Sequence, residues 1–122
     1  MKRGEIWTVS GRGPQVGKPR PAVIIQDDRF ETTQSVAVCG LTTDPTTSPL
    51  LRVAVVPTAQ NGLRQPCQLM VDRITTLPRA RVGTRIGQLE PEIISELNHA
   101  LLIFLGLAAG ATRRRRPNRS SA

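Results

Sequence analysis

The sequence predicts a small, mostly antiparallel β domain that resembles a barrel and is closed by one C-terminal helix. Short runs rich in β-branched residues, separated by loops rich in Gly, Pro and Thr, occupy most of the chain. A single helical pattern follows them. The 122 residues, 39% hydrophobic and 21% charged, can build one hydrophobic core but not two. We therefore expect one domain over residues 1–110 and a basic, disordered tail over residues 111–122.

Six strands are expected, in a chain without internal repeats. The first alternates apolar and polar residues, and the next two are dense in Val, Ile and Ala. The loop between the first two strands, residues 10–19, is rich in Gly and Pro and is long for a hairpin connection, which is typical of a functional loop. The predicted strands cover residues 5–9, 20–26, 35–41, 52–56, 67–77 (with a bend) and 85–89.

The helix is expected to begin near Pro91, because proline suits the first turn and Glu92 suits the positive end of the helix dipole. We expect it to continue to about residue 107 and to stop at Gly110. Past residue 100 nearly every position is apolar, so this half is either deeply buried or shared with a second subunit. One apolar face is predicted to contain Ile93, Leu97, Leu101, Phe104 and Ala108, with Glu92, Glu96 and His99 in an exposed polar stripe.

Charge and composition exclude several classes of protein. The longest apolar run, residues 100–105, is far shorter than the roughly 20 residues that cross a bilayer, and the N-terminus lacks the apolar stretch of a secretory signal. Cys39 and Cys67 belong to no CxxC pair, so neither a zinc site nor a redox motif is expected. These features favour a reduced, cytoplasmic location without a membrane partner.

The formal net charge of +8 is concentrated at the C-terminus, where five arginines lie in the last ten residues. The Arg113 to Arg119 cluster either adds nonspecific, salt-dependent affinity for RNA or is a neutral solvated extension. The sequence leaves both possibilities open.

A predicted hairpin brings two reactive side chains together. If residues 20–26 pair with residues 35–41 so that Ile24 faces Val38, one further extension of the ladder places Arg20 opposite Thr42 on the same face. A guanidinium offers a planar fork of donors for phosphate oxygens, and a hydroxyl can donate to a developing oxyanion. The pair therefore suggests a phosphate site; the alternative is a surface arginine and a turn threonine.

Five segments, in the right order over residues 1–107, resemble the MazF/PemK family of toxins from bacterial type II toxin-antitoxin modules. They are residues 3–7 (RGEIW), 17–26 (GKPRPAVIIQ), 41–43 (LTT), 61–63 (NGL) and 87–89 (GQL). The resemblance implies an SH3-like (CcdB/PemK-type) small antiparallel barrel, a homodimer, and an acidic, partly disordered antitoxin as partner.

The same resemblance implies a sequence-specific endoribonuclease that cleaves single-stranded mRNA without a metal or cofactor. The expected products carry a 2′,3′-cyclic phosphate and a 5′-hydroxyl. The family's catalytic Arg and Thr fall on Arg20 and Thr42. Cys67 stands where the family commonly has Ser. The expected RNA-binding residues are Arg12, Gln15, Lys18, Pro21, Thr43, Arg64 and Cys67.

The residue inventory limits the mechanism. With His99 as the single histidine, a histidine-pair mechanism would need a contribution from a second subunit. Arg20 stays protonated at neutral pH, so its secure role is electrostatic, and whether it also transfers protons stays open. A metal site from Asp27, Asp28 and Asp72 is disfavoured, because adjacent residues on a strand point to opposite faces.

Two rival functions share the predicted fold. A CcdB-like toxin would poison DNA gyrase through the end of the C-terminal helix, and a non-catalytic barrel would bind nucleic acid through its basic face alone. Trp7 is either a base-stacking residue or part of the core. The Lys18 to Pro21 and Leu41 to Thr43 segments favour the ribonuclease.

Overall fold

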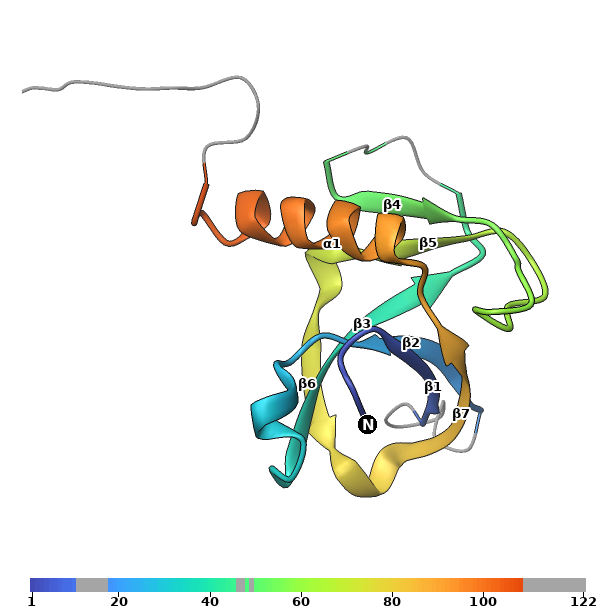
Figure 1. The fold of residues 1–122 in the computed structure, drawn as a ribbon, viewed down its shortest axis with the longest axis vertical. Coiled ribbons are helices and arrows are strands. Elements are labelled where there is room, and N and C mark those ends of the chain that lie inside the picture. Colours follow the sequence, from blue (N-terminus) through green and yellow to red (C-terminus); the bar gives the residue numbers. More distant parts are fainter. Residues whose placement is uncertain (11–17, 46–47, 49, 109–122) are drawn as a thin grey trace, which may run out of the picture.

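The computed structural model describes residues 1–10, 18–45, 48 and 50–108. Within these residues the strands are antiparallel, and one α-helix follows them (Figure 1). The predicted fold class is therefore confirmed. In chain order the elements are β1 (Glu5–Val9), β2 (Arg20–Ile24), η2 (Asp28–Phe30), β3 (Ser35–Thr42), β4 (Arg52–Val55), β5 (Cys67–Met70), η3 (Val71–Arg73), β6 (Thr75–Pro78), η4 (Arg79–Arg81), β7 (Val82–Gln88) and α1 (Pro91–Phe104).

The long strand β3 joins two parts of the sheet. The strands lie in the order β4-β5-β3-β2-β1-β7, and β6 also pairs with β3. The first half of β3 pairs with β6, from Ser35 to Val38, whereas its last residues, Leu41 and Thr42, pair with β5. In Figure 1 the strands β1, β2, β6 and β7 curve around the lower half of the molecule, while β4 and β5 lie beside α1.

The predicted hairpin register is confirmed. In the β2–β3 ladder, Ala22 faces Gly40 and Ile24 faces Val38. β3 continues through Thr42, one residue further than the sequence indicated. The end of β3 therefore lies beside the beginning of β2, where Arg20 is located.

Two strand predictions were wrong. The expected strand over residues 67–77 is two strands, β5 and β6, separated by the 3₁₀ helix η3. Arg52 of β4 holds this turn through an ion pair with Asp72, with Nε and Oδ1 3.0 Å apart. The last strand begins at Val82, rather than at residue 85, and Val82 pairs with Val9 of β1.

Two clusters of buried side chains form the core. The larger one lies between the sheet and α1 and includes Ile6, Leu69 and Leu97. The smaller one contains four side chains from β2 and β3, and Trp7 packs against it, partly buried. The Trp7 indole N–H donates to Glu5 over 3.0 Å, so this residue is tied to the fold.

The helix ends three residues earlier than expected. Gly106 has a φ of 75°, and its amide donates to the carbonyl of Ile103, while the Leu107 amide donates to the carbonyl of Leu102. This pattern is a Schellman motif, in which glycine takes the left-handed conformation that terminates the helix. Gly106, and not Gly110, is therefore the stop signal.

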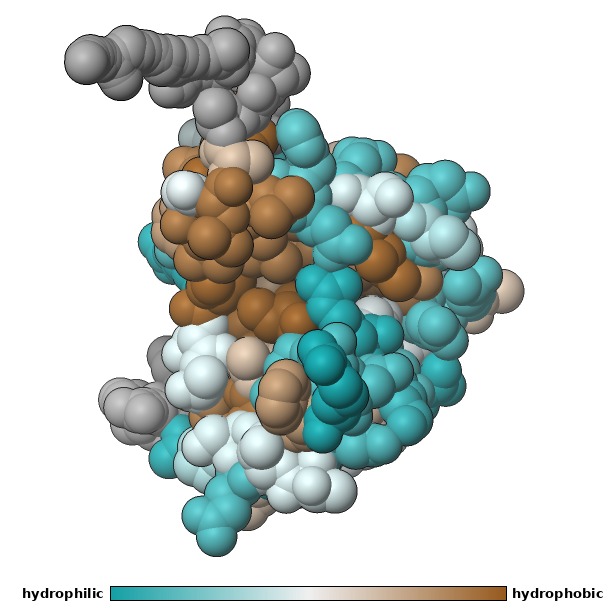
Figure 2. All heavy atoms as spheres, turned by 60° about the vertical axis from the view of Figure 1, so that its left-hand side comes forward, coloured by the Kyte–Doolittle hydropathy of each residue, from teal (hydrophilic) through white to brown (hydrophobic). Residues whose placement is uncertain are grey.

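The end of the helix exposes an apolar patch. Leu97, Ala100 and Leu101 are buried, but Phe104, expected on the buried face, is 41% exposed. The exposed side chains gather over the C-terminal half of α1, as Figure 2 shows, and His99 is exposed as predicted. We call Leu102, Phe104, Leu105 and Leu107 the helix-end patch.

No helix in the described residues is long and apolar enough to span a membrane.

Candidate functional site

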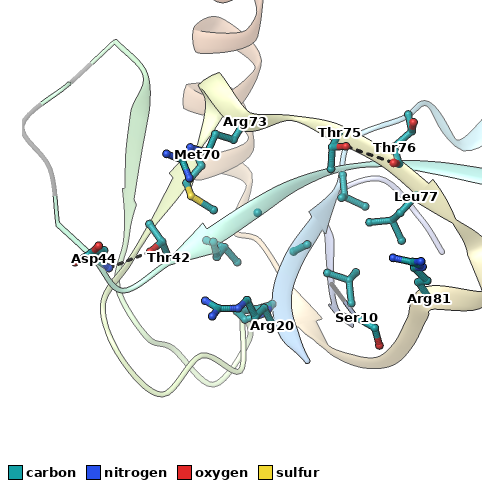
Figure 3. A pocket seen from close by; sticks show the side chains of 16 residues that line it. Ser10, Arg20, Thr42, Asp44, Met70, Arg73, Thr75, Thr76, Leu77 and Arg81 are labelled. Atoms are coloured by element: carbon teal, nitrogen blue, oxygen red, sulfur yellow. Dashed lines mark hydrogen bonds between the residues drawn. The ribbon is translucent and has the colours of Figure 1, made fainter. Parts of the chain in front are cut away.

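A cavity of about 560 Å³ opens where β2 begins and β3 ends. Arg20 enters it from the first position of β2, and Thr42 from the last position of β3 (Figure 3). Its volume is in the range typical of small-ligand sites, about 300–1,000 Å³. The other described lining residues are Val9, Ser10, Pro21, Ala22, Val38, Gly40, Leu41, Asp44, Met70, Arg73, Thr75, Thr76, Leu77 and Arg81.

Arg20 is exposed and pairs through its backbone with Val9 of β1. Within the described part of the chain, its guanidinium forms no ion pair with a carboxylate. Arginine's planar fork of N–H donors matches the oxygens of a phosphate. The side chain is therefore available to bind an anion in the cavity.

Thr42 is held by a short turn. The Asp44 backbone N–H donates to Thr42 Oγ1 over 3.1 Å, a hydrogen bond typical of Ser and Thr at the start of turns. Because Oγ1 acts as the acceptor, the hydroxyl hydrogen is not used in this bond. Thr42 is thus both a turn residue and a lining residue of the cavity, which the sequence presented as alternatives.

Two further arginines, Arg73 and Arg81, line the same cavity. They lie at the ends of the 3₁₀ helices η3 and η4. Asp44 is the one acidic residue among the described lining residues, so basic groups predominate. The sequence prediction missed both arginines, because it assigned residue 73 to a continuous strand and left residue 81 between two predicted strands. The polar Asp72-Arg73 pair inside an apolar run was the signal of a break.

A second cavity, of about 370 Å³, adjoins the first at Pro21, which lines both. Thr42 lines the first cavity and Thr43 the second. The RNA-binding candidates Pro21, Thr43, Arg64 and Cys67 are thus brought together around one hollow. It is lined by Pro21, Thr43, Gly62, Leu63, Arg64, Gln65, Cys67 and Ile86.

Three candidates remain, and the structure describes one of them. Lys18 is exposed, two residues before Arg20, and lines neither cavity. Arg12 and Gln15 lie outside the described residues, as does the arginine cluster of residues 113–119.

Cys67 is a buried thiol in the wall of the second cavity. Its Sγ donates to the backbone carbonyl of Gln65 at 3.3 Å, and burial raises its pKa above the usual thiol value. The thiol is therefore neutral at physiological pH, and its polar atom is directed toward the loop backbone.

The three aspartates considered as metal ligands are engaged in separate interactions. Asp27 accepts from Arg29, Asp28 accepts from the Arg3 amide, and Asp72 pairs with Arg52. Across the described residues, no group of three or more His, Cys, Asp or Glu side chains is placed to hold a metal ion.

Comparison with known proteins gives consistent matches along almost the whole chain. Residues 2–105 match the family described as PemK-like, MazF-like toxin of type II toxin-antitoxin system. A protein of Mycolicibacterium smegmatis named probable endoribonuclease MazF is 47% identical over 108 residues, which cover 88% of this chain and 99% of that protein. Endoribonuclease MazF9 of Mycobacterium tuberculosis is 30% identical over 115 residues, covering 88% and 98%.

A solved structure also has the same fold. It is an endoribonuclease in complex with its cognate antitoxin, from a mycobacterial species. The TM-score is 0.73 with 26% sequence identity, and the superposition covers 88% of this chain and 97% of that one.

Proposed function

Because this chain belongs to the PemK-like, MazF-like toxin family of type II toxin-antitoxin systems and is an endoribonuclease, we propose that Arg20 and Thr42 are its catalytic pair. The observation that carries the proposal is their common position in one cavity at the adjoining ends of β2 and β3. The relatives are named as endoribonucleases, which favours RNA cleavage over gyrase poisoning or simple nucleic-acid binding.

The proposed substrate is single-stranded mRNA, cut at a short sequence without a metal or cofactor. The ribose 2′-oxygen attacks the adjacent phosphorus, a new O–P bond forms, and the bond from phosphorus to the 5′-oxygen breaks. The 2′-hydroxyl loses its proton and the departing 5′-oxygen gains one. The products carry a 2′,3′-cyclic phosphate and a 5′-hydroxyl.

Arg20 stabilises the charge that develops in this step. The pentacoordinate transition state carries more negative charge on its non-bridging oxygens than the ground state does. The Arg20 guanidinium, which forms no ion pair within the described residues, can donate two parallel hydrogen bonds to those oxygens. Arg73 and Arg81 add positive charge in the same cavity.

Thr42 supplies one oriented hydroxyl. Since the Asp44 amide occupies a lone pair of Oγ1, the hydroxyl hydrogen is free to donate to a non-bridging phosphate oxygen. A donor that is oriented before the substrate binds stabilises the transition state without reorganisation at the moment of reaction.

A single assay tests the catalytic pair. The purified full chain is incubated with a long single-stranded RNA in excess EDTA, beside Arg20→Ala, Thr42→Ala and the control Arg29→Ala. Arg29 is exposed on η2 and lines neither cavity. Cuts at a restricted sequence that disappear in the first two variants and persist in the control support the proposal. Cleavage retained by Arg20→Ala or Thr42→Ala contradicts it.

The ends of the fragments test the chemistry. A 5′-hydroxyl end accepts phosphate from a polynucleotide kinase directly, whereas a 5′-phosphate end must first be dephosphorylated. We expect direct labelling of the downstream fragments, and labelling only after phosphatase treatment would contradict transesterification by the 2′-oxygen.

We also propose that the toxin acts in the cytoplasm as a homodimer and is neutralised by an acidic antitoxin. The helix-end patch supports a second copy, because large exposed apolar patches mark interaction surfaces. The formal charge of +8 supports an acidic partner. If light scattering at micromolar protein concentration gives the mass of a monomer, the proposal of a homodimer is wrong.

A further inference from the structure

The two adjoining cavities differ in chemistry. The first contains Arg20, Arg73 and Arg81 and suits a phosphate backbone. The second has apolar walls from Pro21, Leu63 and Ile86. Its lining also includes three exposed polar residues, Thr43, Arg64 and Gln65, which we call its polar edge. Apolar walls with a few convergent polar groups are typical of a site for a flat heteroaromatic ring.

The polar edge of the second cavity can distinguish one base from another. The Gln65 amide both donates and accepts hydrogen bonds, the Thr43 hydroxyl does the same, and the Arg64 guanidinium only donates. Within the described residues Arg64 forms no ion pair, so its donors are available. Such groups recognise the edges of unpaired bases in single-stranded RNA.

The wall that bears these groups is held by a buried polar network. Asn61 is completely buried, and its side-chain oxygen accepts from the amides of Thr58 and Leu63 at 3.0 Å each. Its side-chain nitrogen donates to the carbonyl of Val56 at 2.8 Å and to Glu90 at 3.4 Å. The loop is therefore fastened to the beginning of α1 through Glu90.

The loop is also fixed against β7. Gly62 has a φ of 70°, and a Cβ at this position would lie 2.5 Å from the carbonyl oxygen of Ile86. The Gln88 amide donates to the carbonyl of Gln60 over 3.0 Å. At its other end, Cys67 pairs with Val55 in the β4–β5 ladder. Because both ends of the loop are held by the fold, the second cavity is largely built before any ligand arrives.

We propose that the cavity beside Pro21 binds the base of one nucleotide directly flanking the scissile phosphate, and that Gln65 and Arg64 determine which base is accepted there. The inference rests on the proposed function, since the scissile phosphate is taken to lie at Arg20 and Thr42. The proposal assigns sequence specificity to the loop of residues 62–67. Pro21, which lines both cavities, would lie between the phosphate and the base.

The test uses a single-stranded RNA pool randomised around the cut and the full-length protein. Gln65→Ala and Arg64→Gln are compared with wild type by sequencing the 5′ ends of the fragments. The matched controls are Gln34→Ala and Arg29→Gln, because both residues are exposed and line neither cavity. We expect the preference between the best and second-best base to fall about tenfold at one position flanking the cut, with other positions and the controls unchanged.

The variants are on the surface, and unchanged melting temperatures would exclude misfolding. A preference that is unaltered at both flanking positions in Gln65→Ala and Arg64→Gln overturns the inference, as does an equal loss of cleavage for every sequence. The inference is also overturned if the variants change the mass of the dimer or the affinity for the antitoxin but leave the base preference unaltered. That result would assign the cavity to a protein partner. Failure of the proposed function would give a different result: the wild-type protein would then produce no cuts that disappear in Arg20→Ala.

Discussion

The amide of Asp44 donates a hydrogen bond of 3.1 Å to the hydroxyl oxygen of Thr42, the last residue of β3. In this bond the oxygen is the acceptor, so the hydroxyl hydrogen takes no part in it. The hydroxyl is held by the turn that follows the strand.

Removal of this hydroxyl is expected to impair cleavage while leaving the fold intact. Thr42→Val keeps the shape but removes the donor, and we expect kcat to fall on the order of 10²-fold, as for the loss of one oxyanion donor. Thr42→Ser keeps the donor and is expected to retain most of the activity. Single-turnover cleavage of a defined RNA measures both, and equal activity of the Val and Ser variants would remove the hydroxyl from the mechanism.

Replacement of Arg20 by lysine separates charge from geometry. Lysine retains a positive charge but not the planar fork that binds two phosphate oxygens at once. We expect Arg20→Lys to bind RNA nearly as well as wild type and to cleave it roughly 10²-fold more slowly. Filter binding measures the affinity for RNA, and single-turnover kinetics measure the cleavage rate. A lysine variant with full cleavage activity would show that positive charge alone suffices.

Glu5 is expected to make stability depend on pH in the acid range. Burial alone would raise its pKa, but hydrogen bonds from the Lys2 amide, the Trp7 indole and the Arg85 guanidinium outweigh burial and leave the pKa below the ordinary value of 4.5. A lowered folded-state pKa means that the stabilisation is present above the unfolded-state pKa and is lost as the pH falls through the folded-state value.

Glu5→Gln should therefore be less stable than wild type at pH 7, and its stability should change less between pH 5 and about pH 3. Urea unfolding at a series of pH values measures the effect. Parallel pH profiles for the two proteins would show that Glu5 is not the group responsible.

Gly87 is expected to tolerate no larger side chain. A Cβ at this buried position would lie 2.4 Å from the backbone oxygen of Asn61, and backbone cannot move aside as a flexible side chain can. Gly87→Ala should lower the free energy of unfolding by about 1–3 kcal/mol. Gly40→Ala is the control, since its Cβ would meet only the terminal methyl of Met70, so a similar loss in both variants would contradict the explanation.

Both cysteines are expected to be unreactive in the native protein. Burial raises the pKa of Cys39 to about 12 and also raises that of Cys67. The thiolate is the reactive form, so little of it exists at neutral pH. Ellman's reagent should label neither thiol before denaturation, and rapid labelling of Cys67 would show that the loop of residues 62–67 opens readily.

The hairpin and its register were predictable from the sequence because they depend on local alternation and adjacency. That register alone brings Arg20 and Thr42 together, since the two strands that carry them follow one another in the chain. The lining residues Arg73 and Arg81 were not predictable in the same way, because each is the last residue of a short 3₁₀ helix that the strand pattern did not indicate.

The second cavity was equally unpredictable from the sequence, since its walls come from segments far apart in the chain. Pro21 and Ile86 meet there only because β1 pairs with both β2 and β7. The role of Asn61 was not predictable either. This residue lies in a polar, Pro-rich loop, and complete burial of its side-chain amide depends on tertiary packing. The prediction that the helix stops at Gly110 was wrong for a similar reason, since Gly106 and Gly110 both suit a helix end and the pattern alone favoured the later one.

The pairing of β1 with β7, in which Glu5 faces Gln88, has a consequence for synthesis of the protein. The first strand emerges from the ribosome long before its second neighbour exists, and such distant pairings form late. A nascent or truncated polypeptide ending before residue 82 would expose the free edge of β1, a hazard for aggregation. Translation errors that shorten this toxin should therefore yield insoluble fragments rather than a partly active poison.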